Sequence, residues 1–398
     1  MKNKTWRKPR HRIITRIVRF FLLIHLKIKY RFKHDKSVKF KEGAIILSNH
    51  VTTMDPFMVG ALIKGPMYFM TTMDLFQNKR LGKLIRWLVN PIPKQKSKPS
   101  DLAAIKASIK VAKENGSIVI FPEGNRTLSG KLGYIEPSIV KLVKMLKKPL
   151  VLVNIEGGYG CDPRFSQKVR KGQVKASFKA IYQYDEIKDM DNDELFKIIV
   201  DGLTVNDLDP TKKFKSERSA EYLERVFYKC PICNEYHQIY SEGNNVYCKK
   251  CGLKVEYLEN LRFKANYEKF KFETVYDWYT WQINEAMVIE YTDDKLIYSD
   301  SVKLFEPRFN QKKLFLGEGK MELYNDHFKF VLSKEELIIK FEEIEGITLV
   351  GKKKMNIYAN DKTFQVLYDD KINFLKYMHT YYIIKNKKVG NENGFIGI

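Results

Sequence analysis

The sequence predicts an α/β protein whose first part is a layered domain with a mostly parallel sheet. Short, wholly apolar segments alternate there with amphipathic segments of about a dozen residues, the pattern of strands buried on both faces and crossover helices. Two CxxC pairs follow, and after them short segments alternate apolar and polar residues before a final helical stretch. We therefore expect a zinc ribbon next, and then a small β domain closed by a helix.

The individual elements of the first domain follow from breakers and caps. Strands are expected at 44–48, 67–70, 117–121 and 149–155, and helices at 75–89, 102–115 and 137–146. Ser100 or Asp101 can cap the second helix and Gly116 stops it, while the stretch 90–101 between the first two helices is rich in breakers.

The N-terminus is strongly basic and amphipathic. The chain has a net charge of +24, and residues 1–41 contain one acid, Asp35, among many Lys and Arg residues. This bias predicts a polyanionic partner, an anionic membrane surface or a nucleic acid. In residues 1–30, cations and apolar side chains occupy opposite sides of a helical wheel, which favours a helix lying in the membrane interface. The alternative is a basic helix packed on its own protein. No apolar run is long enough to span a bilayer.

Two motifs stand at the ends of predicted strands. SNHVTTMDPF contains His50 and Asp55, and FPEGNRT contains Glu123, Gly124 and Arg126. Ligands of parallel sheets gather beyond the carboxyl ends of the strands, so the two motifs are expected to meet. A carboxylate one turn beyond a histidine can fix its tautomer, and a guanidinium suits a phosphate. Taken alone, a histidine beside a strand end is more often a structural residue than a catalyst.

The two motifs together resemble the glycerophospholipid acyltransferase family over roughly residues 30–210. The family's NHxxxxD block matches Asn49, His50 and Asp55, and its FPEGTR block matches Phe121 to Arg126. The resemblance implies that His50 deprotonates the acceptor hydroxyl and that Asp55 orients His50. It also implies a set of substrate-binding residues: Asn49, Glu123, Gly124, Asn125 and Arg126.

By this resemblance the protein transfers an acyl chain from acyl-CoA or acyl carrier protein to lysophosphatidic acid, giving phosphatidic acid. No organic cofactor beyond the thioester is implied, and the expected location is the cytoplasmic side of the membrane, peripheral or monotopic. Asn125 and Thr127 depart from the usual Thr and Ser, Lys94 only loosely echoes an intermediate basic block, and Leu152 replaces a late proline. The acceptor could therefore be another lysophospholipid.

The cysteines predict a metal site. Cys230, Cys233, Cys248 and Cys251 form C-x2-C-x14-C-x2-C, which is typical of a structural zinc ribbon, whereas a redox role is a minor alternative. Four thiolates leave no open position for a catalytic metal. Thiols held in this form indicate a reducing compartment, and Cys161 is expected to be only a small core residue.

The expected organisation is a set of five parts. They are an interfacial helix (1–30), the acyltransferase domain (31–215), the zinc ribbon (226–258), an aromatic-rich connection (259–310) and a β domain of pleckstrin-homology-like pattern (311–388). The run Lys352–Lys354 could touch anionic lipid, but a solvated loop is favoured.

Other functions explain less. A nucleic-acid-binding protein would account for the charge and the ribbon, but it leaves both motifs unexplained, and the cations gather beside an apolar helix face. A catalytically dead scaffold is disfavoured because His50, Asp55, Glu123 and Arg126 are all present. Thioester hydrolysis would need water in place of the alcohol.

Overall fold

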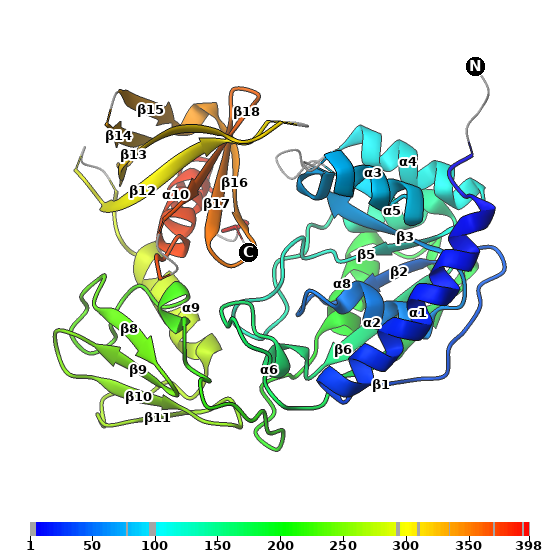
Figure 1. Cartoon of the computed structure of the whole chain (residues 1–398), viewed down its shortest axis with the longest axis horizontal. Helices are drawn as coiled ribbons and strands as arrows, with labels where there is room; N and C mark the ends of the chain where they lie inside the picture. Colours follow the sequence, from blue (N-terminus) through cyan, green and yellow to red (C-terminus); the bar gives the residue numbers. More distant parts are fainter. Residues whose placement is uncertain are drawn as a thin grey trace.

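The structure is a computed structural model. It describes residues 5–76, 79–94, 101–291, 295–308, 311–333, 335–368, 371–391 and 394–397. Part of the predicted breaker segment 90–101 and part of the predicted helix 75–89 lie outside these residues. The described residues form three sheets, of seven, four and seven strands in chain order, and Figure 1 shows the first sheet apart from the other two.

The first sheet confirms the mostly parallel α/β fold. Its strand order is β1-β7-β6-β2-β5-β3-β4, and among these neighbours only β6 and β7 pair antiparallel. The strands are β1 (Lys33–His34), β2 (Ile45–Ser48), β3 (Met67–Thr72), β4 (Ile92–Lys94), β5 (Ser117–Ile120), β6 (Leu150–Glu156) and β7 (Lys175–Tyr182).

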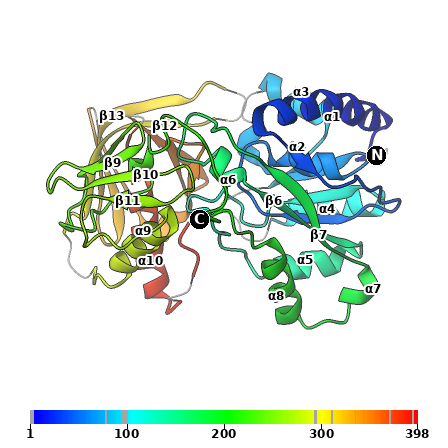
Figure 2. The ribbon, with the colours of Figure 1, turned by 90° about the horizontal axis from the view of Figure 1, so that it is seen from below.

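Helices cover both faces of this sheet (Figures 1 and 2). They are α1 (Pro9–Tyr30), α2 (Asp55–Leu62), α3 (Lys79–Leu88), α4 (Leu102–Lys113), α5 (Ile139–Leu146), α6 (Gly158–Cys161), α7 (Tyr184–Ile187) and α8 (Asn192–Leu203), with a 3-10 turn η1 (Met73–Phe76). Successive residues of β2 explain the two cores: Ile46 packs with α1 and α2, whereas Ile45 and Leu47 pack with α4, α5 and α8. Asp101 caps α4 by accepting from Ala103 N and Ala104 N.

Helix α1 leaves its apolar side uncovered. Ile13, Phe20 and Phe21 are 63%, 62% and 65% exposed, and Ile17, Ile24 and Ile28 share this side. Arg19 turns inward and donates to the carbonyls of Ala61 and Ile63. Of the helices described, none combines the length and apolar content that crossing a bilayer requires.

The second sheet is antiparallel and contains the CxxC pairs. Its order is β11-β10-β9-β8, and its strands are β8 (Ile239–Glu242), β9 (Asn245–Cys248), β10 (Lys254–Tyr257) and β11 (Phe263–Ala265). A 3-10 turn η2 (Leu223–Arg225) precedes it and α9 (Val275–Met287) follows it. Strand β11 lies beyond the predicted end of the ribbon at residue 258.

The third sheet is antiparallel and packs against a buried helix. Its order is β15-β14-β13-β12-β18-β17-β16, with a 3-10 turn η3 (Phe341–Glu343) before β16. Its strands are β12 (Tyr298–Glu306), β13 (Leu314–Leu323), β14 (His327–Leu332), β15 (Glu336–Lys340), β16 (Ile344–Val350), β17 (Lys354–Ala359) and β18 (Lys362–Leu367). Helix α10 (Leu375–Lys388) is buried from Leu375 to Ile384. Because β12 pairs with β13 and β18, the predicted boundary at residue 311 cuts through this sheet.

Candidate active site

His50 and Asp55 form a close pair at the carboxyl end of β2. His50 Nδ1 lies 2.7 Å from Asp55 Oδ2, and the His50 side chain is 21% exposed while that of Asp55 is fully buried. An ionised carboxylate can only accept, so Nδ1 carries the proton and Nε2 presents a lone pair. The sequence-predicted pair is therefore brought together in the geometry of an oriented general base.

Asp55 is held by its own helix start. It opens α2, where Pro56 follows, and it accepts from Val51 N at 2.7 Å, Thr52 N at 3.0 Å and Thr52 Oγ1 at 2.6 Å. Donors at the N-terminus of a helix stabilise a carboxylate through the helix dipole and charge-assisted hydrogen bonds. The carboxylate that faces His50 is thus fixed in place.

The second motif is joined to the first through the backbone of His50. His50 N donates to Glu123 Oε1 at 2.6 Å, and Thr127 N donates to the His50 carbonyl at 2.9 Å. The imidazole also stacks on the Phe121 ring, with centroids 4.5 Å apart. The end of β5 therefore sets both the backbone position and the ring plane of His50.

The side chains of Glu123 and Asn49 form hydrogen bonds with backbone groups. Glu123 Oε2 accepts from Gly133 N at 2.7 Å, so both its oxygens hold backbone amides. Burial raises the pKa of Glu123 to about 8, and these two donors oppose that rise. Asn49 spans β2 and β6, donating to the Ile155 carbonyl at 2.9 Å and accepting from Ile155 N at 2.8 Å. The geometry gives both residues a positioning role, and their contact with substrate stays a prediction.

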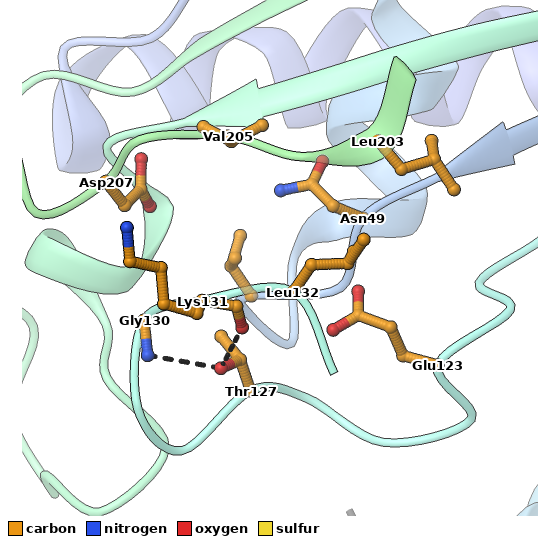
Figure 3. A pocket seen from close by; sticks show the side chains of 10 residues that line it. Asn49, Glu123, Thr127, Gly130, Lys131, Leu132, Leu203, Val205 and Asp207 are labelled. Atoms are coloured by element: carbon orange, nitrogen blue, oxygen red, sulfur yellow. Dashed lines mark hydrogen bonds between the residues drawn. The ribbon is translucent and has the colours of Figure 1, made fainter. Parts of the chain in front are cut away.

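Figure 3 shows Asn49 and Glu123 beside a small cavity behind the motifs. Its wall includes the segment after α8, with Val205 and Asp207, and the turn in which Thr127 Oγ1 binds Gly130 N and the Lys131 carbonyl. Asp207 accepts from Gly157 N and Tyr159 N, and burial raises its pKa to about 6. His50 does not line this cavity.

The middle of FPEGNRT differs from the expectation at Gly124. Its amide, expected to be open to a ligand, donates to the Phe121 carbonyl at 3.0 Å. Its φ of +69° is the left-handed conformation that favours glycine, and a Cβ there would meet no atom within 4 Å. Glycine is therefore required by the turn. Asn125 donates to the Gly397 carbonyl at 3.3 Å, so the C-terminal segment reaches this motif.

Arg126 is a buried cation with spare donor capacity. Its side chain is 8% exposed, and its Nη1 has no hydrogen-bond partner among the described residues. Burial lowers the pKa of Arg126, while Asp162, Asp55 and Tyr30 nearby oppose the shift. An unsatisfied guanidinium donor in a buried site is costly unless an anion completes it.

Sequence reasoning missed the residues that support Arg126. Arg164 donates from Nη1 to the Arg126 carbonyl at 3.1 Å, and it is 4% exposed. Both Asp162 and Arg164 follow Cys161 at the end of α6, where no spacing rule marks them. Cys161 itself is fully buried, and burial raises the pKa of its thiol to about 12.

The four ribbon cysteines converge. Cys230 Sγ and Cys251 Sγ are 3.7 Å apart, as are Cys233 Sγ and Cys248 Sγ, and all four sulfurs lie within 4.8 Å of one another. Such a cluster could hold a metal ion. Four sulfur ligands would leave a tetrahedral ion no open position.

Comparison with known proteins agrees with the motifs. Residues 28–156 match the profile of the family described as Acyltransferase, which contains both motifs. This segment is similar to the glycerophospholipid acyltransferase family.

Two curated relatives of the acyltransferase domain are bacterial. A probable 1-acyl-sn-glycerol-3-phosphate acyltransferase of Mycoplasma pneumoniae is 24% identical over 174 residues, which is 42% of this chain. A 1-acyl-sn-glycerol-3-phosphate acyltransferase of Bacillus subtilis is 28% identical over 135 residues, or 33% of this chain. The matched segment spans 63% of the length of each relative.

A solved structure is also similar to this domain. The crystal structure of the 1-acyl-sn-glycerophosphate (LPA) acyltransferase from Thermotoga maritima aligns with a TM-score of 0.39 and 16% identity. The alignment covers 48% of this chain and 76% of the Thermotoga maritima chain.

Proposed function

We propose that this protein transfers an acyl chain from a thioester to the free hydroxyl of lysophosphatidic acid, giving phosphatidic acid. The observation that carries the proposal is the oriented pair of His50 and Asp55, joined through the backbone to the motif that ends in Arg126. The names of the two curated relatives support the same acceptor.

The proposed chemistry begins at His50 Nε2. This nitrogen takes the proton of the acceptor hydroxyl as its oxygen attacks the thioester carbonyl carbon, and Asp55 stabilises the resulting imidazolium. When the tetrahedral intermediate collapses, the C–S bond breaks and the imidazolium returns the proton to the leaving thiolate. The products are the new ester and a free thiol, so no redox partner is needed.

Arg126 is proposed to hold the phosphate of the acceptor. Its Nη1, which has no partner among the described residues, offers a charge-assisted hydrogen bond, and its side chain is buried. A phosphate bound there would hold the acceptor hydroxyl within reach of His50 Nε2. The energy of phosphate binding would then help to orient the acceptor for attack. Acyl-CoA and acyl carrier protein both remain possible donors.

We place the enzyme on the cytoplasmic side of a membrane. The uncovered side of α1 offers Phe and Ile side chains beside cations, the arrangement that binds anionic interfaces. Helix α3 adds Leu84 and Trp87, which are 50% and 54% exposed, and Arg10 of α1 donates to the Trp87 carbonyl at 2.9 Å. Reduced ribbon thiols fit the cytoplasm.

The cysteine cluster is proposed to hold structural zinc. Zn–S bonds of about 2.3 Å in a tetrahedron place the sulfurs about 3.8 Å apart, and the two sulfur pairs here are 3.7 Å apart. A disulfide would instead need about 2 Å. Cys230, Cys233, Cys248 and Cys251 would be its ligands.

The decisive experiment measures acyl transfer by the purified chain. Lysophosphatidic acid and other lysophospholipids are offered with acyl-CoA and with acyl carrier protein thioester, and the products are identified by mass spectrometry. His50→Ala should lower turnover by roughly 10²–10⁴-fold, the usual contribution of a positioned base. The matched control is His327→Ala, because His327 also pairs with a neighbouring aspartate, at 2.5 Å in the third sheet. Full activity of His50→Ala would refute the mechanism.

A further inference from the structure

A second group of cations surrounds a small cavity where the three parts of the molecule meet. Arg164 and Phe165 come from the loop after α6, and Arg225 comes from η2. Lys352 comes from the turn between β16 and β17, and Lys354 is the first residue of β17. The rest of the wall is Leu128, Leu349, Gly351, Ile372 and Phe374. In Figure 1, α6 lies on the side of the α/β domain that faces the other parts.

The wall of this cavity is positively charged. Its described lining contains two arginines and two lysines and no carboxylate. Arg164 and Arg225 are 4% and 6% exposed, so their charges are removed from water. Gathering buried like charges is unfavourable unless an opposite charge joins them.

Three of these cations donate hydrogen bonds to neutral carbonyls. Arg164 donates to Leu349 O at 3.1 Å as well as to Arg126 O, Arg225 donates to Phe165 O at 3.1 Å, and Lys352 donates to Ser166 O. Carbonyls satisfy donors but leave the net charge in place.

Few acids among the described residues offset this charge. Asp162 lies 3.9 Å from Lys352 Nζ, and Glu224 lies 3.9 Å from Lys371 Nζ. Burial and the neighbouring Arg126 lower the pKa of Arg164 to about 9, and burial lowers the pKa of Lys352 although Asp162 opposes it. Both shifts come first from burial, which disfavours the charged form of each side chain.

We propose that this cavity is a second anion site, which binds a phosphate group between the α/β domain, the ribbon and the third sheet. Its lining contains none of the catalytic or acceptor-binding residues of the two motifs, although it adjoins them through the bond from Arg164 to the Arg126 carbonyl. Two forked guanidinium groups and two ammonium groups suit a phosphate dianion. The phosphate could belong to a soluble monoester or to a lipid headgroup.

The site also corrects the expectation for Lys352–Lys354. A solvated loop was favoured there, but Lys352 and Lys354 are half-buried and line the cavity, and only Lys353 is exposed. A bound phosphate would link this turn to the loop whose Arg164 supports the Arg126 carbonyl. The proposal holds whether or not the acceptor is lysophosphatidic acid.

The test compares substitutions of the two lysines that line the cavity with a substitution of Lys353, which lies between them and does not line it. Binding of inorganic phosphate is measured by calorimetry and by the rise in Tm at constant ionic strength, for wild type, K352Q/K354Q and the control K353Q. We expect K353Q to behave as wild type and K352Q/K354Q to lose roughly 10-fold or more in affinity, the usual effect of removing charged hydrogen-bond donors. The single variants K352Q and K354Q serve if the double variant does not fold.

The acceptor site is distinguished by R126Q. Phosphate binding that disappears in R126Q and survives in K352Q/K354Q belongs to the acceptor site and overturns the proposal, as does absence of binding in wild type. Vesicles containing phosphatidic acid identify the source of the phosphate. If K352Q/K354Q also weakens vesicle binding relative to K353Q, the ligand is a headgroup, whereas unchanged vesicle binding with lost phosphate binding indicates a soluble monoester.

Discussion

At the scale of single residues, the site is organised by a few carboxylates that hold backbone amides. Asp55 binds the amides of Val51 and Thr52 while it faces His50, and Glu123 binds those of His50 and Gly133. The loop that carries His50 is therefore fixed at both sides before any substrate arrives, which is the form of preorganisation that catalysis by positioning requires.

Replacing Asp55 by Asn should damage both orientation and charge. Asn keeps one acceptor oxygen, but its amide group would face the donors now bound by Asp55, and the imidazolium would lose its counterion. We expect turnover to fall by roughly 100-fold or more while the acceptor KM stays nearly constant. Steady-state kinetics beside the control Asp326→Asn checks this. A variant that turns over as fast as wild type would show that the pair does not orient the base.

Arg126→Ala should act on the acceptor instead. If Nη1 binds the acceptor phosphate, its loss raises the acceptor KM and leaves the thioester KM unchanged, because the interaction is made before the transition state. The control is Arg218→Ala, whose exposed side chain pairs with Glu221. An unchanged acceptor KM would assign the phosphate to other groups.

The sequence could predict which residues meet here but not what each one does. The strand ends bring His50 and Glu123 together in any parallel sheet of this order, and spacing alone placed Asp55 one turn on. Spacing carries no information on hydrogen-bond partners. It therefore could not predict that Gly124 N donates to the Phe121 carbonyl or that the Asn49 side chain donates to the Ile155 carbonyl. Arg164 was missed because its contact with Arg126 depends on the loop path after α6.

At the scale of elements, the strands that escaped prediction are those with weak or mixed patterns. Strand β7 is only partly buried and contains two lysines, Lys175 and Lys179, so it lacks the apolar run of β6. Strand β12 follows the helix α9 in an aromatic-rich stretch and finds its partners only at β13 and β18, beyond the predicted boundary. Long-range pairing of this kind is not written in local sequence.

The apolar side of α1 should determine membrane attachment. Phe20→Asp with Phe21→Asp would replace two side chains that are 62% and 65% exposed. Losing two aromatic rings that would insert into the bilayer should weaken vesicle binding by about 3 kcal/mol, which is about 100-fold. Co-sedimentation with anionic vesicles measures this against Val288→Asp with Val389→Asp, two exposed apolar residues elsewhere. Equal sedimentation of both double variants would place the anchor on another surface.

Helices α9 and α10 are tied by a neutral histidine. His379 lies between Tyr228 and Tyr279, with its ring nitrogens 3.3 Å and 3.1 Å from their hydroxyls, and burial lowers its pKa from 6.5 to about 3. The unfolded chain binds a proton there below about pH 6.5, whereas the folded protein does not. The free energy of unfolding should therefore fall by about 1.4 kcal/mol per pH unit as the pH decreases below 6.5.

This dependence is measured by urea unfolding between pH 7.5 and 5, followed by tryptophan fluorescence because Trp278 and Trp281 lie on α9. His379→Phe should be less stable at pH 7.5 and should lack the acid-dependent part, while His25→Phe, exposed on α1, should keep it. An unchanged pH slope in His379→Phe would show that the folded and unfolded states bind protons equally at this residue.

At the scale of the whole molecule, the ribbon connects the other two parts. Trp278 of α9 donates to the Lys229 carbonyl beside Cys230, and Asn373 before α10 donates to the Glu224 carbonyl. These contacts join the cysteine cluster to the packing of the third sheet's helix. The cavity between Arg164 and Lys352 is formed by residues of all three parts. No single segment of the sequence could therefore predict it.

Removing the metal should loosen this junction first. About one zinc per chain is expected, and a strong chelator should release it with a change in tryptophan fluorescence, because structural zinc contributes folding energy directly. Cys248→Ser should be less soluble while its His50 pair stays intact. Elemental analysis checks the content, with Cys161→Ser as the control outside the cluster. A chain without zinc, or with disulfides among these cysteines, would contradict the assignment.

The buried thiol of Cys161 has a practical consequence. With its pKa raised to about 12 and no exposed surface, it is not available to an alkylating reagent in the native protein. After chelation, the reagent should add to the four ribbon thiols quickly, and the fifth addition should wait until the α/β domain opens. The rate of the fifth mass increment therefore measures how fast the catalytic domain opens in the intact chain. This increment should be absent in Cys161→Ala. A fifth adduct formed as fast as the other four would show that α6 already admits the reagent.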